Sequence, residues 1–396
     1  MTKGALRRSR TTWLFSALLV AIFVVAGTGV AGAAHVSSPQ ARTHKAMTTV
    51  HVDLNWLPNV EFAGIWVGIQ KGWFRQAGLN VPGITSGLGA GVRYYDYSNT
   101  PELENDLCTK QSNVLCVGVD DSSAIPIARQ AGQMITGVWA GSQKTPFGFM
   151  TCWVPPKHHV YNKCVSNNKV ARSGKNITSP KQWKGLRIAY QQDELYVPAL
   201  MLGSVGLNLS QVTLVPTGFT WGGLTTGKTE DAHLVFINNE PIALRLQGVK
   251  TNVIKGYKYG MSAFYADTMF VDDSAMNTYS KQIKAFVGVV DRGWKYAMHN
   301  PNTTAAMVVS KYFTPANGGG GPQPVKQQQI EIGQFASTLS RDKAGKIDGR
   351  MTLARWNTII HDLKTYPGNP GGNPIITADI KGKDCFTDKF APPAAK

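Results

Sequence analysis

From about residue 50 to residue 271, short apolar runs alternate with segments of helical spacing. Residues 50–54 alternate as a strand does, and residues 62–77 have the spacing of a helix that Gly78 ends. Residues 114–119 are a continuous apolar run, typical of a buried strand. The other predicted helices are 124–131, 196–205 and 241–246, and the other strands are 79–81, 133–140, 186–190, 212–216, 232–237, 253–255 and 269–271. This alternation predicts an α/β fold with parallel sheets.

Beyond residue 271 the pattern is mainly helical, with predicted helices at 279–299, 303–312, 327–340 and 353–365. Two stretches, residues 103–119 and 224–237, repeat one order of short helix, turn and buried strand. A chain of 396 residues also exceeds what one core usually serves. We therefore expect two similar α/β lobes, with a ligand cleft between the carboxyl ends of their strands.

The N-terminus has the organisation of a secretory signal. Four basic residues within the first ten precede an apolar run from Trp13 to Val25, and Ala31-Gly32-Ala33 follows. This pattern predicts a signal peptide at residues 1–34, a flexible N-terminus at 35–48 and an exported protein, periplasmic or extracellular. Extending the apolar run to Val30 leaves an uncleaved membrane anchor as the alternative.

The chain is basic, with a formal net charge of +17, and seven Lys or Arg but no acid fall within residues 157–184. An exported protein rarely meets nucleic acid, so nucleic acid is not an expected partner. Attraction to an anionic cell surface and a simple solvated loop are the two interpretations of residues 157–184.

Export makes disulfides plausible for the five cysteines. Their spacing favours two short-loop bridges, Cys108 with Cys116 and Cys152 with Cys164. Other connectivities stay open, and Cys385 either replaces one of these residues or stays free. No pair has the spacing of a zinc or redox site.

Residues 222–229 match the phosphate-loop pattern GxxxxGK[ST]. That loop must leave a strand and open a helix, whereas here a short helix precedes the strand predicted at 232–237. The acidic pairs Asp120-Asp121 and Asp272-Asp273 are adjacent and would face opposite ways on strands. We therefore expect neither nucleotide binding nor an enzyme, and no cofactor or metal.

Residues 55–64 read Asn-Trp-Leu-Pro-Asn-x-x-Phe-Ala-Gly, and residues 71–81 read Lys-Gly-Trp-Phe-x-x-Ala-Gly-Leu-Asn-Val. These residues resemble the opening of the thiamine-pyrimidine-precursor-binding family, which is similar to hydroxymethylpyrimidine synthases and to binding proteins for riboflavin, alkanesulfonates and nitrate. The proteins that it resembles are substrate-binding components of ABC importers. Further matches at 117–132, 183–189, 224–232, 236–241 and 283–301 extend the resemblance over about residues 50–310.

The resemblance implies a type II periplasmic-binding-protein fold, in which two α/β lobes joined by two hinge crossovers close on a ligand. The crossovers would lie near residues 145–151 and 257–267. Lobe 1 would comprise residues 49–146 plus 264–390, lobe 2 residues 147–263, and the tail residues 391–396. A monomer that delivers its ligand to an ABC permease is expected.

The ligand-facing residues implied by the resemblance lie at strand ends. They are Trp56, Asn59, Phe62, Asp120, Ser122, Gln191, Gln192, Asp193, Asn239 and Glu240. Trp56 offers a face for stacking a heteroaromatic ring, with core packing as the alternative. Glu240 suits a ring amine or amidine, with a solvated helix N-terminus as the alternative. Phe62 stands where the pyrimidine binders usually have His, so the ligand would be larger or more apolar.

The predicted function is binding of a small nitrogenous heteroaromatic, similar to a thiamine pyrimidine precursor, for an ABC importer. An alkanesulfonate, nitrate or riboflavin-type ligand is the alternative within the same class. A pyridoxal-phosphate-using synthase is disfavoured, because no His occurs between His51 and His158 and the cysteine-rich motif of that branch is missing. A wall-associated adhesion or scaffold protein is the third alternative.

Overall fold

The computed structural model describes residues 47–85, 114–154, 176–191, 194–218, 220–226, 229–317, 319–321, 323–341, 347–368 and 372–393. All of these residues belong to one compact unit, residues 45–396. The predicted signal peptide, most of the basic segment 157–184, Gln192, Asp193, Cys108 and Cys164 lie outside the described residues. Within the described ranges, no helix is both long and apolar enough to cross a membrane.

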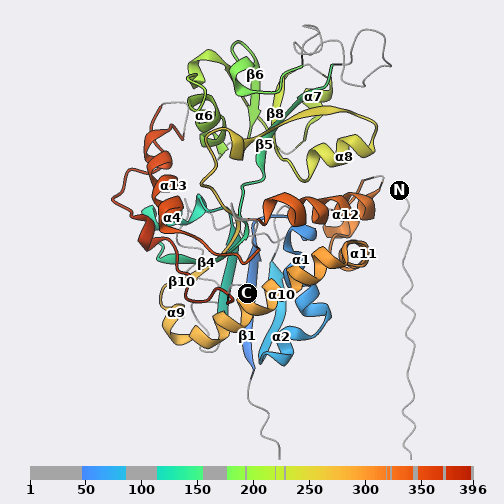
Figure 1. Cartoon of the computed structure of the whole chain (residues 1–396), viewed down its shortest axis with the longest axis vertical. Coiled ribbons are helices and arrows are strands. Elements are labelled where there is room, and N and C mark those ends of the chain that lie inside the picture. Colours follow the sequence, from blue (N-terminus) through green and yellow to red (C-terminus); the bar gives the residue numbers. More distant parts are fainter. Residues whose placement is uncertain are drawn as a thin grey trace, which may run out of the picture. The chain divides into compact units, whose positions relative to one another are not determined.

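Lobe 1 is built on a five-stranded mixed sheet (Figure 1). Its order is β2 (Leu79–Thr85), β1 (Thr48–Leu54), β3 (Val114–Asp120), β10 (Ala266–Asp272) and β4 (Ile135–Ser142). Strand β1 is parallel to β2 and β3, whereas β10 is antiparallel to β3 and β4. The inward-facing residues of these strands are almost all apolar, so the sheet is the centre of a buried core.

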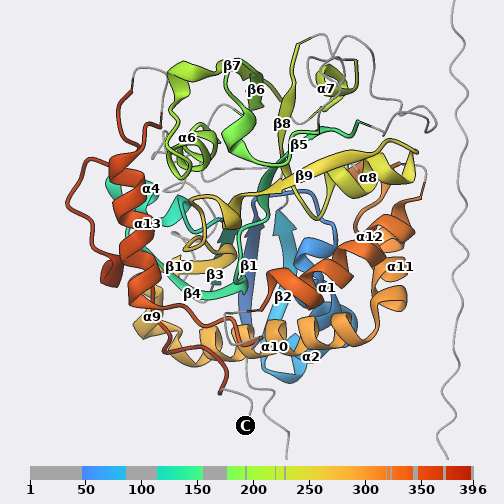
Figure 2. The same cartoon turned by 45° about the horizontal axis from the view of Figure 1, so that its top comes forward.

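Lobe 2 repeats this arrangement (Figure 2). Its order is β7 (Thr213–Pro216), β6 (Arg187–Tyr190), β8 (Ala232–Phe236), β5 (Phe147–Cys152) and β9 (Thr251–Lys255). Strand β6 is parallel to β7 and β8, and β5 is antiparallel to β8 and β9. The predicted two-lobed α/β fold is therefore confirmed.

The sheets are mixed, however, and not parallel as the pattern predicted. The antiparallel strand of each sheet is the one that the chain enters on arriving from the other lobe. Strand β5 follows β4 of lobe 1, and β10 follows β9 of lobe 2. The two neighbours of each of these strands run parallel to one another. Each strand starts at the edge of the sheet where those neighbours end, so it runs in the opposite direction.

Helices cover the sheets of both lobes (Figure 1). In lobe 1 they are α1 (Ala63–Gln70), α2 (Trp73–Gln76), α4 (Ala124–Gln130), α9 (Ala275–Thr278), α10 (Ser280–His299), α11 (Pro301–Lys311), α12 (Pro324–Gln334) and the π-helical turn η8 (Phe335–Leu339). The buried residues of α13 (Leu353–Thr365) belong to a core cluster that includes residues of both lobes. In lobe 2 they are α6 (Tyr196–Gly203), α7 (Gly222–Thr226) and α8 (Glu240–Leu246). Short 3-10 turns are η1 (Val60–Phe62), η3 (Pro180–Gln182), η5 (Leu209–Gln211), η6 (Gly256–Lys258), η7 (Pro315–Asn317) and η9 (Gly382–Asp384).

Two local predictions need correction, and a third is confirmed. The helix predicted over 62–77 breaks into α1 and α2 at Gly72, whose φ of +66° no helical residue adopts. Strand β5 was not predicted, because residues 147–151 were assigned to the first crossover; their fully buried pattern is that of a central strand. The phosphate-loop match is excluded as expected, since α7 precedes β8.

Two short segments connect the lobes, residues 143–146 between β4 and β5 and residues 259–265 between η6 and β10. Arg355 of α13 binds both. Its guanidinium donates to the carbonyl oxygens of Gln143 (2.7 Å), Ala263 (2.9 Å) and Phe264 (3.1 Å). It also lies 3.5 Å from the centre of the Tyr265 ring. One side chain thus holds the two crossovers together.

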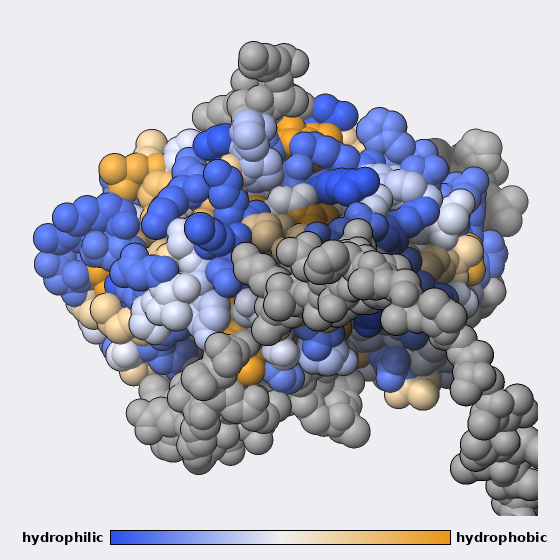
Figure 3. All heavy atoms as spheres, turned by 90° about the horizontal axis from the view of Figure 1, so that it is seen from below, coloured by the Kyte–Doolittle hydropathy of each residue, from blue (hydrophilic) through white to orange (hydrophobic). Residues whose placement is uncertain are grey.

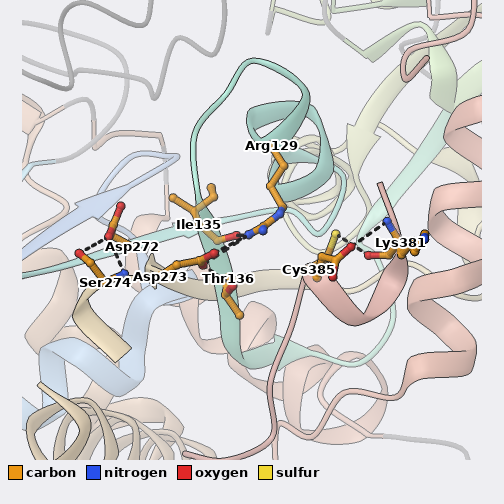
Figure 4. Close-up of polar contacts among 9 residues, drawn as sticks. Arg129, Ile135, Thr136, Asp272, Asp273, Ser274, Lys381 and Cys385 are labelled. Atoms are coloured by element: carbon orange, nitrogen blue, oxygen red, sulfur yellow. Dashed lines mark hydrogen bonds and ion pairs between the residues drawn. The ribbon is translucent and has the colours of Figure 1, made fainter. Parts of the chain in front are cut away.

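The C-terminal segment returns to lobe 1 and packs on β4 (Figure 4). Gly137 donates from its backbone nitrogen to the Cys385 carbonyl oxygen at 2.9 Å. Nearby, Asp273 accepts hydrogen bonds from Thr136 Oγ1 (2.6 Å) and Arg129 Nη1 (3.1 Å), which fasten α4 and β4 to the end of β10. Contacts between residues far apart in the sequence therefore hold the C-terminal segment, α4, β4 and the end of β10 together in lobe 1.

The face of lobe 1 opposite lobe 2 is mainly hydrophilic where its side chains are described, with small, separate apolar areas (Figure 3). Scattered apolar side chains of this kind are normal on a protein surface.

Candidate functional site

The edge of the first sheet that faces lobe 2 carries polar residues at successive strand ends. Asn55 follows β1, Asp120 ends β3, and Asp267 lies at the start of the antiparallel β10. Asn55 Nδ2 donates to Asp120 Oδ1 at 3.3 Å, and the Asp121 backbone nitrogen donates to the same oxygen at 2.7 Å. As in other α/β proteins, the carboxyl ends of the parallel strands form the side on which a ligand can bind.

Four carboxyl groups meet at this edge, and we call Glu61, Asp120, Asp121 and Asp267 the carboxylate cluster. Glu61 is 2% exposed, Asp267 3% and Asp121 8%, and Asp120 is half-buried. Ser142 Oγ donates to Asp267 Oδ2 at 2.5 Å, and Glu61 is hydrogen-bonded to Asp267. Among the described residues, no group of His, Cys, Asp or Glu is arranged to hold a metal ion.

Burial and mutual repulsion keep protons on this cluster. Burial raises the pKa of Glu61 well above its usual value, and the neighbouring charges of Asp267 and Asp121 raise it further. Burial also raises the pKa of Asp121, as do the charges of Asp120 and Glu194. Burial raises the pKa of Asp267 to about 6. Neutral Glu61 can therefore donate a hydrogen bond to Asp267.

The backbone at Asp267 is strained. Its φ is +48°, a left-handed conformation that Asp tolerates better than most residues. Such conformations cost on the order of 1–3 kcal/mol and concentrate at functional sites. Strain at a residue that is also a buried acid marks this point of the edge as a candidate site.

Several buried acceptor oxygens at this edge have no hydrogen-bond donor among the described residues. They are Asn55 Oδ1, Glu61 Oε1, Asp121 Oδ1 and Asp267 Oδ1. In lobe 2, Asn238 Oδ1, two residues after β8, also has no donor among the described residues. A buried acceptor without a donor costs about 1–3 kcal/mol. The site therefore favours a molecule that brings N–H or O–H donors, or ordered water.

Lobe 2 approaches the cluster through the residues after β6 and β8. Tyr196 Oη and Ser123 Oγ lie 2.9 Å apart and join the two lobes. Gln327 Nε2 of α12 donates to Asn239 Oδ1 at 2.7 Å, a second contact between the lobes. Glu240 opens α8, is 9% exposed, and accepts from the Phe236 backbone nitrogen at 2.9 Å; burial raises its pKa to about 7.

The structure places three of the predicted ligand residues in internal roles. Asn59 caps η1 by accepting from the Glu61 backbone nitrogen at 2.8 Å, and Phe62 is 2% exposed within the core of lobe 1. Ser122 is fully buried and exchanges hydrogen bonds of 3.0 Å with the backbone of Tyr265 in the second crossover. Ligand contacts for these residues stay predictions.

The other predicted residues lie at the facing edges of the two lobes. Trp56 is half-buried against the core of lobe 1, Asp120 belongs to the carboxylate cluster, and Gln191 Nε2 lies 3.4 Å from the Leu234 carbonyl oxygen. Asn239 and Glu240 share the start of α8. Gln192 and Asp193 fall outside the described residues.

Sequence reasoning missed Glu61, Asp121 and Asp267 as site residues. Asp121 was considered only as one of an adjacent pair, whose side chains would face opposite ways on a strand. Strand β3 ends at Asp120, so the alternation no longer applies to Asp121. An acid directly after a buried apolar strand is the signal that points to the site.

The states of three cysteines can be compared with the predicted disulfides. Cys116 in β3 and Cys152 in β5 are both disulfide-bonded, and Cys385 is a buried free thiol whose pKa burial raises to about 12. Cys108 and Cys164 lie outside the described residues, so the pairing stays a prediction.

Comparison with known proteins finds a matching family model and two relatives that are named as binding proteins. Residues 161–304 match the family described as NMT1/THI5 like. The chain is 21% identical over 363 residues to the riboflavin-binding protein RibY of Chloroflexus aurantiacus, covering 91% of each chain. It is also 21% identical over 266 residues to the formylaminopyrimidine-binding protein of Halalkalibacterium halodurans, covering 66% of this chain and 70% of that one.

The fold has solved counterparts. A periplasmic sulfonate-binding protein, SsuA of a putative sulfonate ABC transporter from Methylobacillus flagellatus, superposes with a TM-score of 0.57 at 12% identity, covering 87% of this chain and 93% of that one. At a sequence identity this low, the similarity shows a shared fold and nothing more. The chain therefore has the two-lobed fold of periplasmic binding proteins and resembles, in the sequence of residues 161–304, the NMT1/THI5 like family.

Proposed function

We propose that this protein is the exported substrate-binding component of an ABC importer and binds a small nitrogenous heteroaromatic between its lobes. The observation that carries the ligand class is the carboxylate cluster, with its acceptor oxygens that lack donors. A pyrimidine with exocyclic amino groups, or a flavin, presents N–H donors in the plane of a ring. The names of the two curated relatives, which refer to riboflavin and formylaminopyrimidine, support this class.

The same cluster argues against an anionic ligand. A sulfonate or nitrate is usually bound by Arg, Lys or helix N-terminal amides. Here a negative group would approach Asp120, Asp121 and Asp267, where burial, and after it the charge of Asp120, already raises the pKa of Asp121. The alkanesulfonate alternative is therefore the weaker one.

We further propose that lobe 1 comprises residues 49–146 and 264–390 and lobe 2 residues 147–263, and that the ligand stacks on Trp56. Asp120, Gln191, Asn239 and Glu240 would contact its polar edge, together with Asp121. Binding followed by delivery to a permease, and not catalysis, is the proposed activity, because the curated relatives are named as binding proteins.

The test is ligand-dependent thermal stability of the chain without residues 1–34. The compounds are 4-amino-5-hydroxymethyl-2-methylpyrimidine, its formylaminomethyl analogue, riboflavin, methanesulfonate and nitrate. A ligand present at 100 times its dissociation constant stabilises the folded state by about 2.7 kcal/mol, which raises the melting temperature by several degrees. We expect a heteroaromatic to do this and the anions to have no effect.

Asp121→Asn is the matched variant, because it keeps the shape of the side chain and replaces a carboxyl group, which can give its proton up to accept an N–H donor, with an amide, which cannot become a carboxylate. We expect it to weaken binding of the heteroaromatic at least tenfold, whereas Asp379→Asn, a change of an 84% exposed carboxylate, leaves binding unchanged. A shift caused by methanesulfonate or nitrate, or no shift with any heteroaromatic, would overturn the proposal.

A further inference from the structure

A cavity of about 440 Å³ lies beside α8 and β9 and shares no residue with the carboxylate cluster. Most of its wall belongs to lobe 2, but Gln334, Thr338 and Leu339 of α12 and η8 in lobe 1 complete it. The backbone of Leu339 also accepts from the Gln143 nitrogen of the first crossover at 2.7 Å. We call this cavity the basic pocket.

Three cationic side chains line the basic pocket. Arg245 lies in α8, Lys250 just before β9 and Lys255 at the end of β9. Neither Asp nor Glu is among the described residues that form its wall. Cations gathered around a concave surface raise the local concentration of anions.

Aromatic rings accompany two of these cations. Lys250 Nζ lies 4.9 Å from the ring centre of Trp153, and Lys255 Nζ lies 5.8 Å from that of Tyr257. Both rings are half-buried in the wall of the pocket. They can therefore contact a planar apolar group while the cations contact its charged end.

The floor of the basic pocket is apolar. Ile237, Ile242 and Leu339 line it and are buried in the free protein. A fully hydrated inorganic ion would gain little from such a floor. Small-molecule sites typically combine a mainly apolar lining with a few polar groups that fix orientation, and this pocket does so with cations.

We propose that the basic pocket is a second binding site, which takes a small organic anion with an aromatic body and a sulfonate, phosphate or carboxylate head. The body lies between Trp153 and Tyr257, and the head lies among Arg245, Lys250 and Lys255. The chemistry is opposite to that of the carboxylate cluster, so the two sites select different molecules.

The test uses two fluorescent probes on the chain without residues 1–34. They are 8-anilinonaphthalene-1-sulfonate and its neutral counterpart N-phenyl-1-naphthylamine, which has the same rings without the sulfonate. We expect the sulfonate to bind and the neutral probe to bind at least tenfold more weakly. Raising the NaCl concentration from about 50 to 500 mM should weaken the binding of the sulfonate probe only, because salt screens exposed ionic contacts.

The variant is Arg245→Gln with Lys255→Gln, and its matched control is Lys258→Gln with Lys281→Gln, two exposed lysines outside the pocket. We expect the first double variant to bind the sulfonate probe at least tenfold more weakly than the wild type. The control should bind the probe with unchanged affinity. Asp121→Asn should also leave it unchanged, which separates this site from the cleft. Equal affinity of the two probes, salt-independent binding, or equal binding to both double variants would overturn the proposal.

Discussion

At the scale of single residues, the candidate site is a set of acids held where water is scarce. Glu240 shows the consequence most simply, because its carboxylate accepts a backbone hydrogen bond and is nevertheless buried. Burial raises its pKa from 4.5 to about 7. The folded state thus keeps a proton that the unfolded chain releases at lower pH.

The free energy of unfolding is therefore expected to fall as the pH rises from about 4.5 to 7. In that window the folded state binds more protons than the unfolded chain, so raising the pH favours unfolding. Glu240 contributes up to roughly 3 kcal/mol to the decline, and Asp267, with its pKa of about 6, adds a change of the same sign. Urea denaturation at pH 5, 6, 7 and 8 measures this decline in the free energy of unfolding.

Glu240→Gln should flatten this dependence, because the amide oxygen can still accept from Phe236 and no proton is bound. The exposed Asp379→Asn serves as control and should keep the wild-type slope. An unchanged slope in Glu240→Gln would show that its carboxyl group is not the source.

At the scale of elements, lobe 1 depends on the close approach of two helices. Gly64 of α1 and Gly293 of α10 face each other so closely that a Cβ at residue 293 would lie 2.1 Å from the Gly64 carbonyl oxygen. The pattern of residues 279–299 predicted a helix with one apolar face, and it forms as α10. That pattern did not predict which helix would pack there, because the contact is between glycines, which carry no hydrophobic signal.

Gly293→Ala is expected to destabilise lobe 1 by about 1–3 kcal/mol or more, because a methyl group must push α1 and α10 apart. Gly288→Ala on the same helix is the matched control, since a Cβ there meets no neighbour. It should be neutral or stabilising by up to about 1 kcal/mol. Urea denaturation of both variants compares them, and equal effects would contradict the packing argument.

At the scale of the whole molecule, the relation between the lobes rests on the crossovers and on contacts such as Ser123 with Tyr196. Arg355 is the residue that joins the crossovers, since it binds carbonyl oxygens of Gln143 in one and Ala263 in the other. It lies more than 90 residues from Ala263 in the sequence. Nothing in the local pattern of α13 marks it for this role.

Arg355→Gln should lower the free energy of unfolding by about 2–4 kcal/mol, because several buried carbonyl oxygens lose a charged donor. Trypsin should also cleave faster after Lys144, which lies in the first crossover. Arg292→Gln, which removes a surface cation 3.7 Å from the Trp73 ring, is the control and should cost less than about 1 kcal/mol. Similar losses in the two variants would argue against a special role for Arg355.

The sequence by itself determined the alternation of strands and helices, and with it the α/β class and the two lobes. Strands such as β3 and helices such as α10 depend on local periodicity, which a single chain displays directly. The resemblance at residues 55–64 also pointed to the edge of β1 where the site lies. Composition alone predicts neither the fold class nor the position of the candidate site.

Only the tertiary structure decided which polar residues meet. Glu61, Asp121 and Asp267 come from three separate parts of the chain, and each looks in sequence like an ordinary surface acid. Their shared properties, burial and raised pKa, arise because the fold brings these three parts of the chain close together. The antiparallel direction of β5 and β10 was likewise set by the crossovers, because strand direction depends on where the chain enters a sheet, which local hydrophobic pattern does not encode.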